Sequence, residues 1–277
     1  MDHFSIAVDN DYEWLLKVNP SVVVEDPVTK ILSIYWLSES HIQCLKGLLE
    51  NHLTIDELDK EIITLFSTIY ILEQRDHLKQ RSLNWQKTIE KAKEELLEHK
   101  ILTLHDVIQP VVLAIARKYL RHLDQQKYLI ADKANGKTKE RYWQHRDDFT
   151  FFIQSQMCTL LNQILPEPVK IGHNAITVYK PGATLPKHID DVLAFSWVMS
   201  VPLDTQPERD RGQAWPIFVE TDDNKVLSSS LSMGDAVLIN PQMPHWRDML
   251  EDHSLGIVFL WFIPANYQGF VNGHWID

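Results

Sequence analysis

Hydrophobic and polar positions follow different periods in the two halves of the chain. From about residue 38 to 165, apolar residues recur every three or four positions over long segments, as they do in amphipathic helices. From residue 174 onward, short runs rich in Val, Ile, Phe and Trp are separated by turn signals such as Pro-Gly and Met-Gly-Asp. The pattern predicts an α+β protein in which a mainly helical part precedes an antiparallel jelly roll.

Residue types and helix caps predict the first secondary-structure elements of the chain. The β-branched residues of 21–36 indicate a short hairpin. Ser38 or Ser40 is a suitable N-cap for the helix that follows. Thr54 and Glu57 form a capping box ahead of a second apolar stripe, so we expect another helix to begin there.

Three further helices are expected before the strands begin. Residues 83–100 alternate apolar positions with Glu and Lys. The next helix should open near Asp106, with Pro110 in or near its first turn. The segment 141–152 is interpreted mainly as the start of the last helix, which ends before the Pro-Glu-Pro at 166–168.

The short apolar runs are expected to form the strands of the second half of the fold. Gly234, in a Met-Gly-Asp turn, is expected to have a positive φ just before a strand. The expected strands are 174–184, 194–204, 215–220, 231–240 and 255–264.

Composition narrows the class of protein. The chain has 277 residues, of which 44% are hydrophobic and 23% charged, as in ordinary globular proteins. The net charge of −11 argues against nucleic acid as a partner and fits a neutral or cationic small partner. The sequence has no apolar run long enough to cross a membrane and no secretory-signal pattern at its start. With only two cysteines, Cys44 and Cys158, we expect no disulfide and a cytoplasmic location.

One short stretch suggests metal chemistry. His188 and Asp190 stand two residues apart, and alternate side chains of an extended segment point the same way. His245, in a later Pro-His pair, is the candidate third ligand. Two histidines and one carboxylate form the facial triad of non-haem Fe(II) oxygenases, which leaves three positions open. The His-x-Asp pair alone would equally suit a polar surface turn.

The order of motifs carries more weight than any one of them. Between Tyr179 and Trp261 the chain reads Tyr-x-x-Gly, His-x-Asp, Gly-Gln, Met-Gly-Asp-Ala and Pro-His. Over about residues 105–265 this resembles the 2-oxoglutarate/Fe(II)-dependent dioxygenases, on their prolyl 4-hydroxylase-like side. The resemblance implies a double-stranded β-helix, with His188, Asp190 and His245 as iron ligands and 2-oxoglutarate as co-substrate. Because Asp190 is present, it implies hydroxylation, desaturation or cyclisation rather than halogenation.

The chain departs from that pattern at the co-substrate anchor. The family pattern places a Lys or Arg on the strand after the distal histidine, where this chain has Ser-Leu-Gly at 254–256. Arg247, two residues after His245, is the best substitute, because a guanidinium matches a carboxylate. The alternative role for Arg247 is a salt bridge to Asp248 or Glu251 on the rim of the barrel. Tyr179 and Ser254 could add hydroxyl donors, with a half-buried aromatic and a strand-end hydroxyl as their alternatives.

The sequence says less about which residues surround the entrance to the proposed metal site. Arg141, Trp143 and Arg146 could contact substrate, although solvated charges at a helix start explain them as well. The polar segment 204–215 could be a lid or a plain surface loop.

We expect two domains: a mainly helical region, 1–100, and an oxygenase domain with lead-in helices, 101–277. Residues 21–75 resemble small winged-helix domains that hold leader peptides, which would make this part peptide-binding; otherwise its helices buttress the barrel or form a homodimer. The predicted activity is hydroxylation of an amino-acid or peptide side chain with Fe(II) and 2-oxoglutarate. The alternatives are a non-catalytic jelly-roll module that binds peptides, and a cupin-like metal oxygenase that does not use 2-oxoglutarate.

Overall fold

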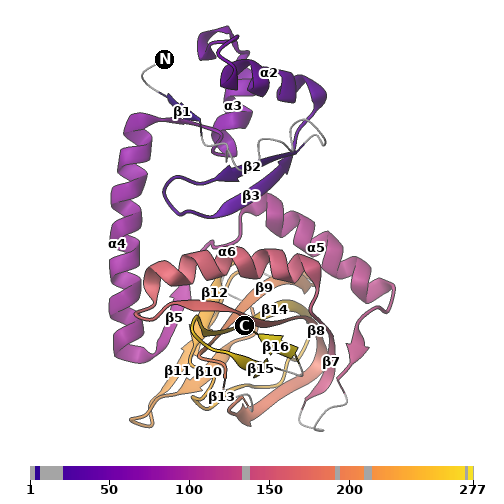
Figure 1. Cartoon of the computed structure of the whole chain (residues 1–277). Helices are drawn as coiled ribbons and strands as arrows, with labels where there is room; N and C mark the ends of the chain where they lie inside the picture. Colours follow the sequence, from indigo (N-terminus) through magenta and orange to yellow (C-terminus); the bar gives the residue numbers. More distant parts are fainter. Residues whose placement is uncertain are drawn as a thin grey trace. The chain divides into compact units, whose positions relative to one another are not determined.

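Figure 1 shows the computed structural model of the chain. It describes residues 4–6, 21–132, 138–190, 194–208, 214–271 and 274–276. The chain divides into two compact units, Met1–Glu90 and Lys91–Asp277, and the boundary lies within the long helix α4 (Arg75–His99).

The first unit combines short strands with helices. The β2–β3 pair is the hairpin predicted from the sequence, and β1 pairs with β4. The elements are β1 (Phe4–Ile6), β2 (Ser21–Glu25), β3 (Leu32–Trp36), α2 (Glu39–Leu49), η2 (Ile55–Glu57), α3 (Lys60–Thr68) and β4 (Leu72–Gln74).

Capping residues begin the helices of this unit. The Ser38 hydroxyl accepts from the backbone N–H of His41 at 3.3 Å and caps α2. The capping box of Thr54 and Glu57 begins a single 3-10 turn, and α3 starts only at Lys60. Apolar faces of α2 and α3 pack with the hairpin into a core of their own.

The second unit contains most of the strands. Its elements are β5 (Ile101–Leu104), α5 (Pro110–Gln125), β6 (Ile130–Ala131), β7 (Lys139–His145), α6 (Asp148–Ile164), β8 (Val169–His188), β9 (Trp197–Gln206), β10 (Ile217–Glu220), β11 (Val226–Ser229), β12 (Ala236–Ile239), β13 (His245–Arg247), β14 (Ser254–Pro264), β15 (Gly269–Val271) and β16 (His274–Ile276).

These strands form the predicted jelly roll, so the fold class is confirmed. Their order is β11-β10-β13-β8-β14-β9-β12-β5, with β7 alongside β8. The long strand β8 pairs with β14 over 169–179 and with β13 near its end, so one strand belongs to both faces of the roll. Gly182, between the two parts, has φ +89°, a conformation that suits glycine.

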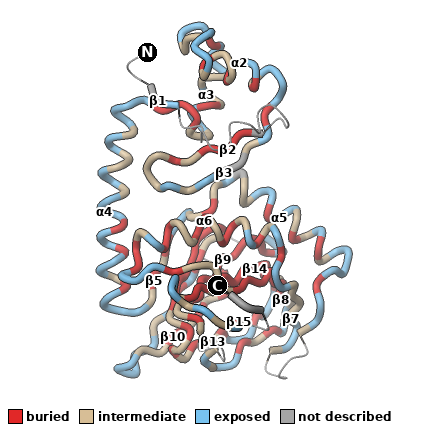
Figure 2. The backbone as a smooth tube through the Cα atoms, in the orientation of Figure 1, coloured by how far each residue is buried: buried red, intermediate tan, exposed pale blue. Residues whose placement is uncertain are grey.

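Helices α5 and α6 pack on the outer face of the sheet (Figure 1). The Gln154 side chain of α6 donates to the backbone carbonyls of His173 and Trp261 at 2.8 and 2.9 Å, which ties the helix to β8 and β14. Gly256 of β14 lies so close to α5 that a Cβ there would be 2.6 Å from Leu120 Cδ2. Figure 2 shows that β9 and β14 are mostly buried.

Two stretches assigned to helical parts of the sequence are strands. Residues 101–104 form β5, which pairs with β12, and the helix expected near Asp106 begins only at Pro110. The segment 141–152, interpreted mainly as a helix start, begins with strand β7, and α6 starts at Asp148. Its charged residues conceal the strand because β7 has few apolar residues to show a period of two.

The two cysteines, the hydropathy of the helices and one glycine turn were each considered from the sequence. Cys44 and Cys158 are free thiols. Of the helices in the described ranges, none is both long and apolar enough to span a bilayer. Gly234 has φ +89°, as its turn predicts.

Candidate metal centre and its cavity

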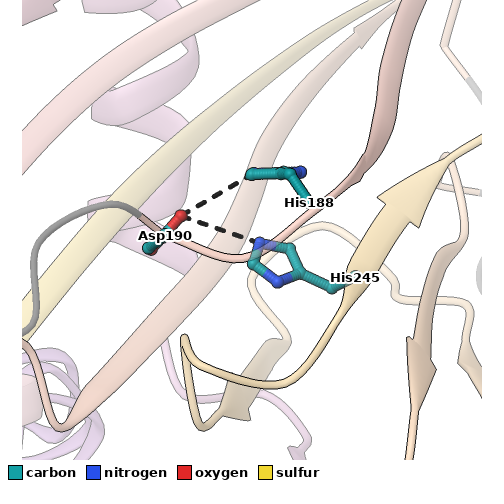
Figure 3. A group of neighbouring side chains, drawn as sticks. All are labelled: His188, Asp190 and His245. Carbon is teal, nitrogen blue, oxygen red and sulfur yellow. Dashed lines mark ion pairs between the residues drawn. The ribbon is translucent and has the colours of Figure 1, made fainter.

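Three predicted ligands lie together at the end of β8 and the start of β13. His188 closes β8, Asp190 follows two residues later, and His245 is the direct cross-strand partner of His188. One donor atom from each of the three lies within 4.8 Å of the others. Figure 3 shows the side chains converging from the two segments.

Backbone carbonyls orient both imidazoles. His188 Nδ1 lies 2.8 Å from the Pro186 carbonyl, and His245 Nδ1 lies 2.9 Å from the Met243 carbonyl. A carbonyl only accepts, so Nδ1 carries the hydrogen and Nε2 is left with a lone pair. The two Nε2 atoms face Asp190 Oδ1 at 3.7 and 3.8 Å. These separations are too long for hydrogen bonds and leave room for a cation between the three atoms.

His245 is suited to bind a metal as a neutral ligand. Its side chain is only 7% exposed. Burial, together with the neighbouring His188, lowers the pKa of His245 below its usual value. The neutral imidazole, the form that binds metals, is therefore favoured at neutral pH.

Asp190 is fixed by contacts on its other side. Trp261 Nε1 donates to Asp190 Oδ2 at 2.8 Å. The Asp190 backbone N–H donates to the Pro241 carbonyl at 2.9 Å, and the Gln242 side chain donates to the Asp190 carbonyl at 3.2 Å. With Oδ2 occupied, Oδ1 remains directed at the two histidines. Sequence reasoning missed this role of Trp261; alternation along β14 could have indicated that its side chain faces the roll.

A cavity of about 190 Å³ adjoins these ligands. It is lined largely by apolar and aromatic side chains, with a few charged and hydroxyl groups among them. The lining residues are Asp132, Thr138, Arg141, Trp143, Tyr179, Leu185, Pro186, His188, Ile189, Asp190, Val198, Ile217, His245, Phe259 and Trp261.

The three predicted anchor residues lie in different places. Tyr179 lines the cavity, is fully buried, and burial raises the pKa of its phenol. Within the described residues its hydroxyl has no hydrogen-bond partner. Arg247 is 3% exposed and donates from Nη1 to the Trp215 carbonyl. Ser254, at the start of β14, is not among the residues that line the cavity.

Arg247 is a buried cation with spare donors. Burial lowers its pKa to about 10, and Nε and Nη2 have no partner among the residues that the structure describes. It is not on a rim, so the expected alternative of an ion pair there does not hold. Nor does it line the cavity: it lies beside Tyr179, near enough that its charge partly offsets the rise that burial causes in the pKa of the phenol.

Of the three residues suggested as substrate contacts, Arg141 and Trp143 line the cavity. Arg146 does not; it is exposed and has φ +57°. The suggested lid, 204–215, falls partly outside the described residues, because 209–213 are not among them.

The donor set fits a ferrous ion. Two neutral imidazoles and one carboxylate oxygen, with further positions open toward a cavity, are the ligands of non-haem Fe(II) sites. The orphaned donors of Arg247 and Tyr179 also fit a second ligand that carries a carboxylate.

No family model matches the sequence, and no curated protein matches it. Solved structures do match the fold. A prolyl-4-hydroxylase of Pseudomonas putida has a TM-score of 0.52 at 14% identity, covering 64% of this chain and 100% of that one. A Trichoplax adhaerens prolyl hydroxylase, solved with a hypoxia inducible factor peptide fragment, has a TM-score of 0.56 at 10% identity, covering 69% and 94%.

A third match is the epimerase SnoN of nogalamycin biosynthesis, solved with Fe3+, alpha ketoglutarate and nogalamycin RO. It has a TM-score of 0.53 at 11% identity, covering 68% of this chain and 88% of that one. Identities this low show a shared fold. The chain therefore has the double-stranded β-helix that these prolyl hydroxylases and this alpha-ketoglutarate-dependent epimerase share with it.

Proposed function

We propose that this protein is an Fe(II)- and 2-oxoglutarate-dependent oxygenase that hydroxylates an unactivated C–H bond of an amino-acid or peptide side chain. The observation that carries the proposal is the convergence of His188 Nε2, His245 Nε2 and Asp190 Oδ1 beside a cavity. The shared fold supports the same class of reaction.

His188, Asp190 and His245 would hold the iron on one side and leave three neighbouring positions open. Bound Fe(II) would supply the oxygen chemistry, coupled to decarboxylation of 2-oxoglutarate. The protein's part is to fix the ligand geometry and to exclude water from the cavity with its aromatic wall, which includes Trp143, Phe259 and Trp261. No side-chain nucleophile is required.

Tyr179 and Arg247 are the proposed anchor for the far carboxylate of 2-oxoglutarate. Both are buried, and both have hydrogen-bond donors without partners in the described part of the chain. Burying a carboxylate without a cation beside it costs several kcal/mol, so such donors would stabilise it. The proposed hydroxyl contact from Ser254 has less support, because Ser254 neither lines the cavity nor is among the described residues that have a buried donor without a partner.

Asp190 favours oxygen transfer over halogenation, because its carboxylate takes the position that a halide would need. The substrate is proposed to enter past Arg141 and Trp143, which line the cavity. An apolar, aromatic-lined space suits the aliphatic portion of a side chain. The peptide-binding role of residues 21–75 stays a prediction.

The test is anaerobic Fe(II) binding, followed by succinate release from 2-oxoglutarate on addition of oxygen. His188→Ala and His245→Ala should each abolish stoichiometric iron binding. His105→Ala is the matched control, since this histidine is 71% exposed and pairs with Asp235, away from the cluster. Stoichiometric iron in either ligand variant would contradict the proposal.

Two other outcomes would point to other functions. Iron binding without 2-oxoglutarate binding would favour a cupin-like oxygenase, in keeping with the missing Lys or Arg at 254–256. Failure of the wild-type protein both to bind iron and to release succinate would favour a non-catalytic binding module.

A further inference from the structure

We propose that Arg141, on β7, supplies a second cation for the far carboxylate of 2-oxoglutarate and so replaces the basic residue that β14 lacks. The inference rests on the proposed function and assigns one more residue to the same site. It differs from the sequence interpretation, in which Arg141 was a candidate contact for substrate.

The register of the sheet brings Arg141 to this position. Tyr179 of β8 has two direct cross-strand neighbours: Leu255 of β14 on one side and Arg141 of β7 on the other. Directly paired residues point to the same face of a sheet, with Cβ atoms about 5 Å apart. Leu255 lies in the segment where the family pattern has its basic anchor, and it is a fully buried apolar side chain. A cation that serves the Tyr179 hydroxyl can therefore come from the opposite neighbour.

The surroundings of Arg141 hold its guanidinium at the cavity wall. Its Cζ lies 4.1 Å from the ring centre of Trp143 and 5.6 Å from those of Tyr179 and Phe259. Nη1 contacts Asp132 Oδ2 at 3.4 Å, a long single contact. Within the described residues Nε is buried and has no hydrogen-bond partner. The group is thus oriented in advance and still has donor capacity for an incoming anion.

Arg141 and Arg247 differ in whether they reach the cavity. Arg141 and Tyr179 both line the cavity, whereas Arg247 does not. A carboxylate that enters from the metal side would meet Arg141 and the Tyr179 hydroxyl at the wall, with Arg247 adding its field from behind the phenol. Both arginines are close enough to act on the Tyr179 phenol.

Formal charges balance in this arrangement. Arg141 and Arg247 together with Asp132 carry a net charge of +1, which the far carboxylate neutralises. At the other end, a ferrous ion is balanced by Asp190 and by the carboxylate of the chelating end. Each end of the bound 2-oxoglutarate would thus lie in a neutral environment, as burial of charge requires.

The test compares two keto acids with the iron-loaded protein without oxygen. 2-Oxoglutarate and 2-oxobutyrate have the same chelating end, and only the first has a far carboxylate. Affinities are measured by calorimetry and by the visible charge-transfer band. Arg141→Gln should weaken 2-oxoglutarate about 10- to 100-fold and leave the affinities for 2-oxobutyrate and iron unchanged. Arg141→Lys should recover part of the loss.

Controls separate this role from a general loss of charge or of fold. Lys139→Gln removes the same charge from an exposed position of the same strand and should change neither affinity. Asp132→Asn provides an independent measurement of opposite sign, because removal of the competing carboxylate should tighten 2-oxoglutarate binding only. If Arg247→Gln alone weakens 2-oxoglutarate while Arg141→Gln and Asp132→Asn bind it as the wild type does, the inference is wrong and the proposed function stands. If the wild type binds iron but neither keto acid, both fail.

Discussion

Trp261→Phe tests whether the indole holds Asp190 in the orientation that a metal needs. The substitution removes the Nε1–H that donates to Asp190 Oδ2 at 2.8 Å and keeps an aromatic ring in place. That ring packs against Phe195 and His173, with centroids 5.8 and 5.5 Å away. Asp190 would then be free to rotate, and the unoccupied Oδ2 would compete with Oδ1.

The size of the effect follows from the type of bond. A hydrogen bond to a charged carboxylate contributes about 1.5–3 kcal/mol. About 1.4 kcal/mol is a tenfold change in Kd, so the metal should bind about 10- to 100-fold more weakly. Loss of a hydrogen-bonding partner of a metal ligand costs about as much in other metal proteins. Because Trp261 is only half-buried, we expect a value near the lower end.

The assay is an anaerobic titration with Fe(II), repeated with Mn(II), whose free ion is measured by electron paramagnetic resonance. Trp246→Phe is the matched control: this tryptophan stacks on Phe218 with centroids 5.6 Å apart, and no hydrogen bond from its ring to Asp190 is present. Thermal melting of both variants shows how much each loses in packing.

This role of the indole is refuted if Trp261→Phe binds metal as tightly as the wild type does. It is also refuted if the two variants lose affinity equally, since a common loss would reflect packing rather than the bond to Asp190.

Three further predictions concern stability in urea unfolding. Gly256→Ala should lose about 1–3 kcal/mol, because its Cβ would be 2.6 Å from Leu120 Cδ2; no loss would show that Leu120 moves freely. Asp147→Ala removes the cap of α6, a 2.9 Å bond from Thr150 N–H, and should cost about 1–2 kcal/mol, unless another group caps the helix. Burial lowers the pKa of Arg247 to about 10, so stability falls as pH drops toward 10 from the higher pKa of the unfolded chain, and the charged form opposes folding below that. At pH 7, Arg247→Met should therefore stabilise the ligand-free protein by about 1–3 kcal/mol; a less stable variant would show that the contacts of Arg247 with Trp215 outweigh the cost of burying its charge.

The sequence predicted those elements for which the spacing of hydrophobic residues and the residue types indicate the same structure. The strand that contains Val178 and Tyr179 was visible from its β-branched and aromatic residues, and the turn at Gly234 from its glycine. His188 and Asp190 were grouped because side chains alternate along extended backbone. His245 was a candidate third ligand from its place in a later Pro-His pair, and the order of motifs strengthened that assignment, because no local period relates residues on distant strands.

The features that the sequence did not predict depend on contacts with distant segments of the same chain. Strand β7 contains Lys, Glu, Arg, Gln and His, so it has no apolar stripe and extends only because β8 pairs with it. For the same reason Arg141 could not be placed next to Tyr179 before the register was known. The bond from Trp261 to Asp190 depends on Asp190, two residues after β8, lying next to β14, which no local pattern specifies.

The metal end and the anchor end of the proposed 2-oxoglutarate site differ in how deeply they are buried. Burying cations at the anchor end costs folding free energy, which a bound carboxylate can recover. His188 and Asp190 are partly open, at 24% and 18% side-chain exposure, whereas Tyr179 and Arg247 are almost fully enclosed. A guanidinium with no anionic partner among the described residues destabilises the ligand-free fold in that interior, and a carboxylate that neutralises it returns this free energy as binding affinity. 2-Oxoglutarate should therefore raise the melting temperature of the iron-loaded protein more than 2-oxobutyrate does at equal saturation of the chelating end. Because the difference arises at the buried end, it should shrink when Arg141 or Arg247 is replaced, while the stabilisation by iron alone stays the same.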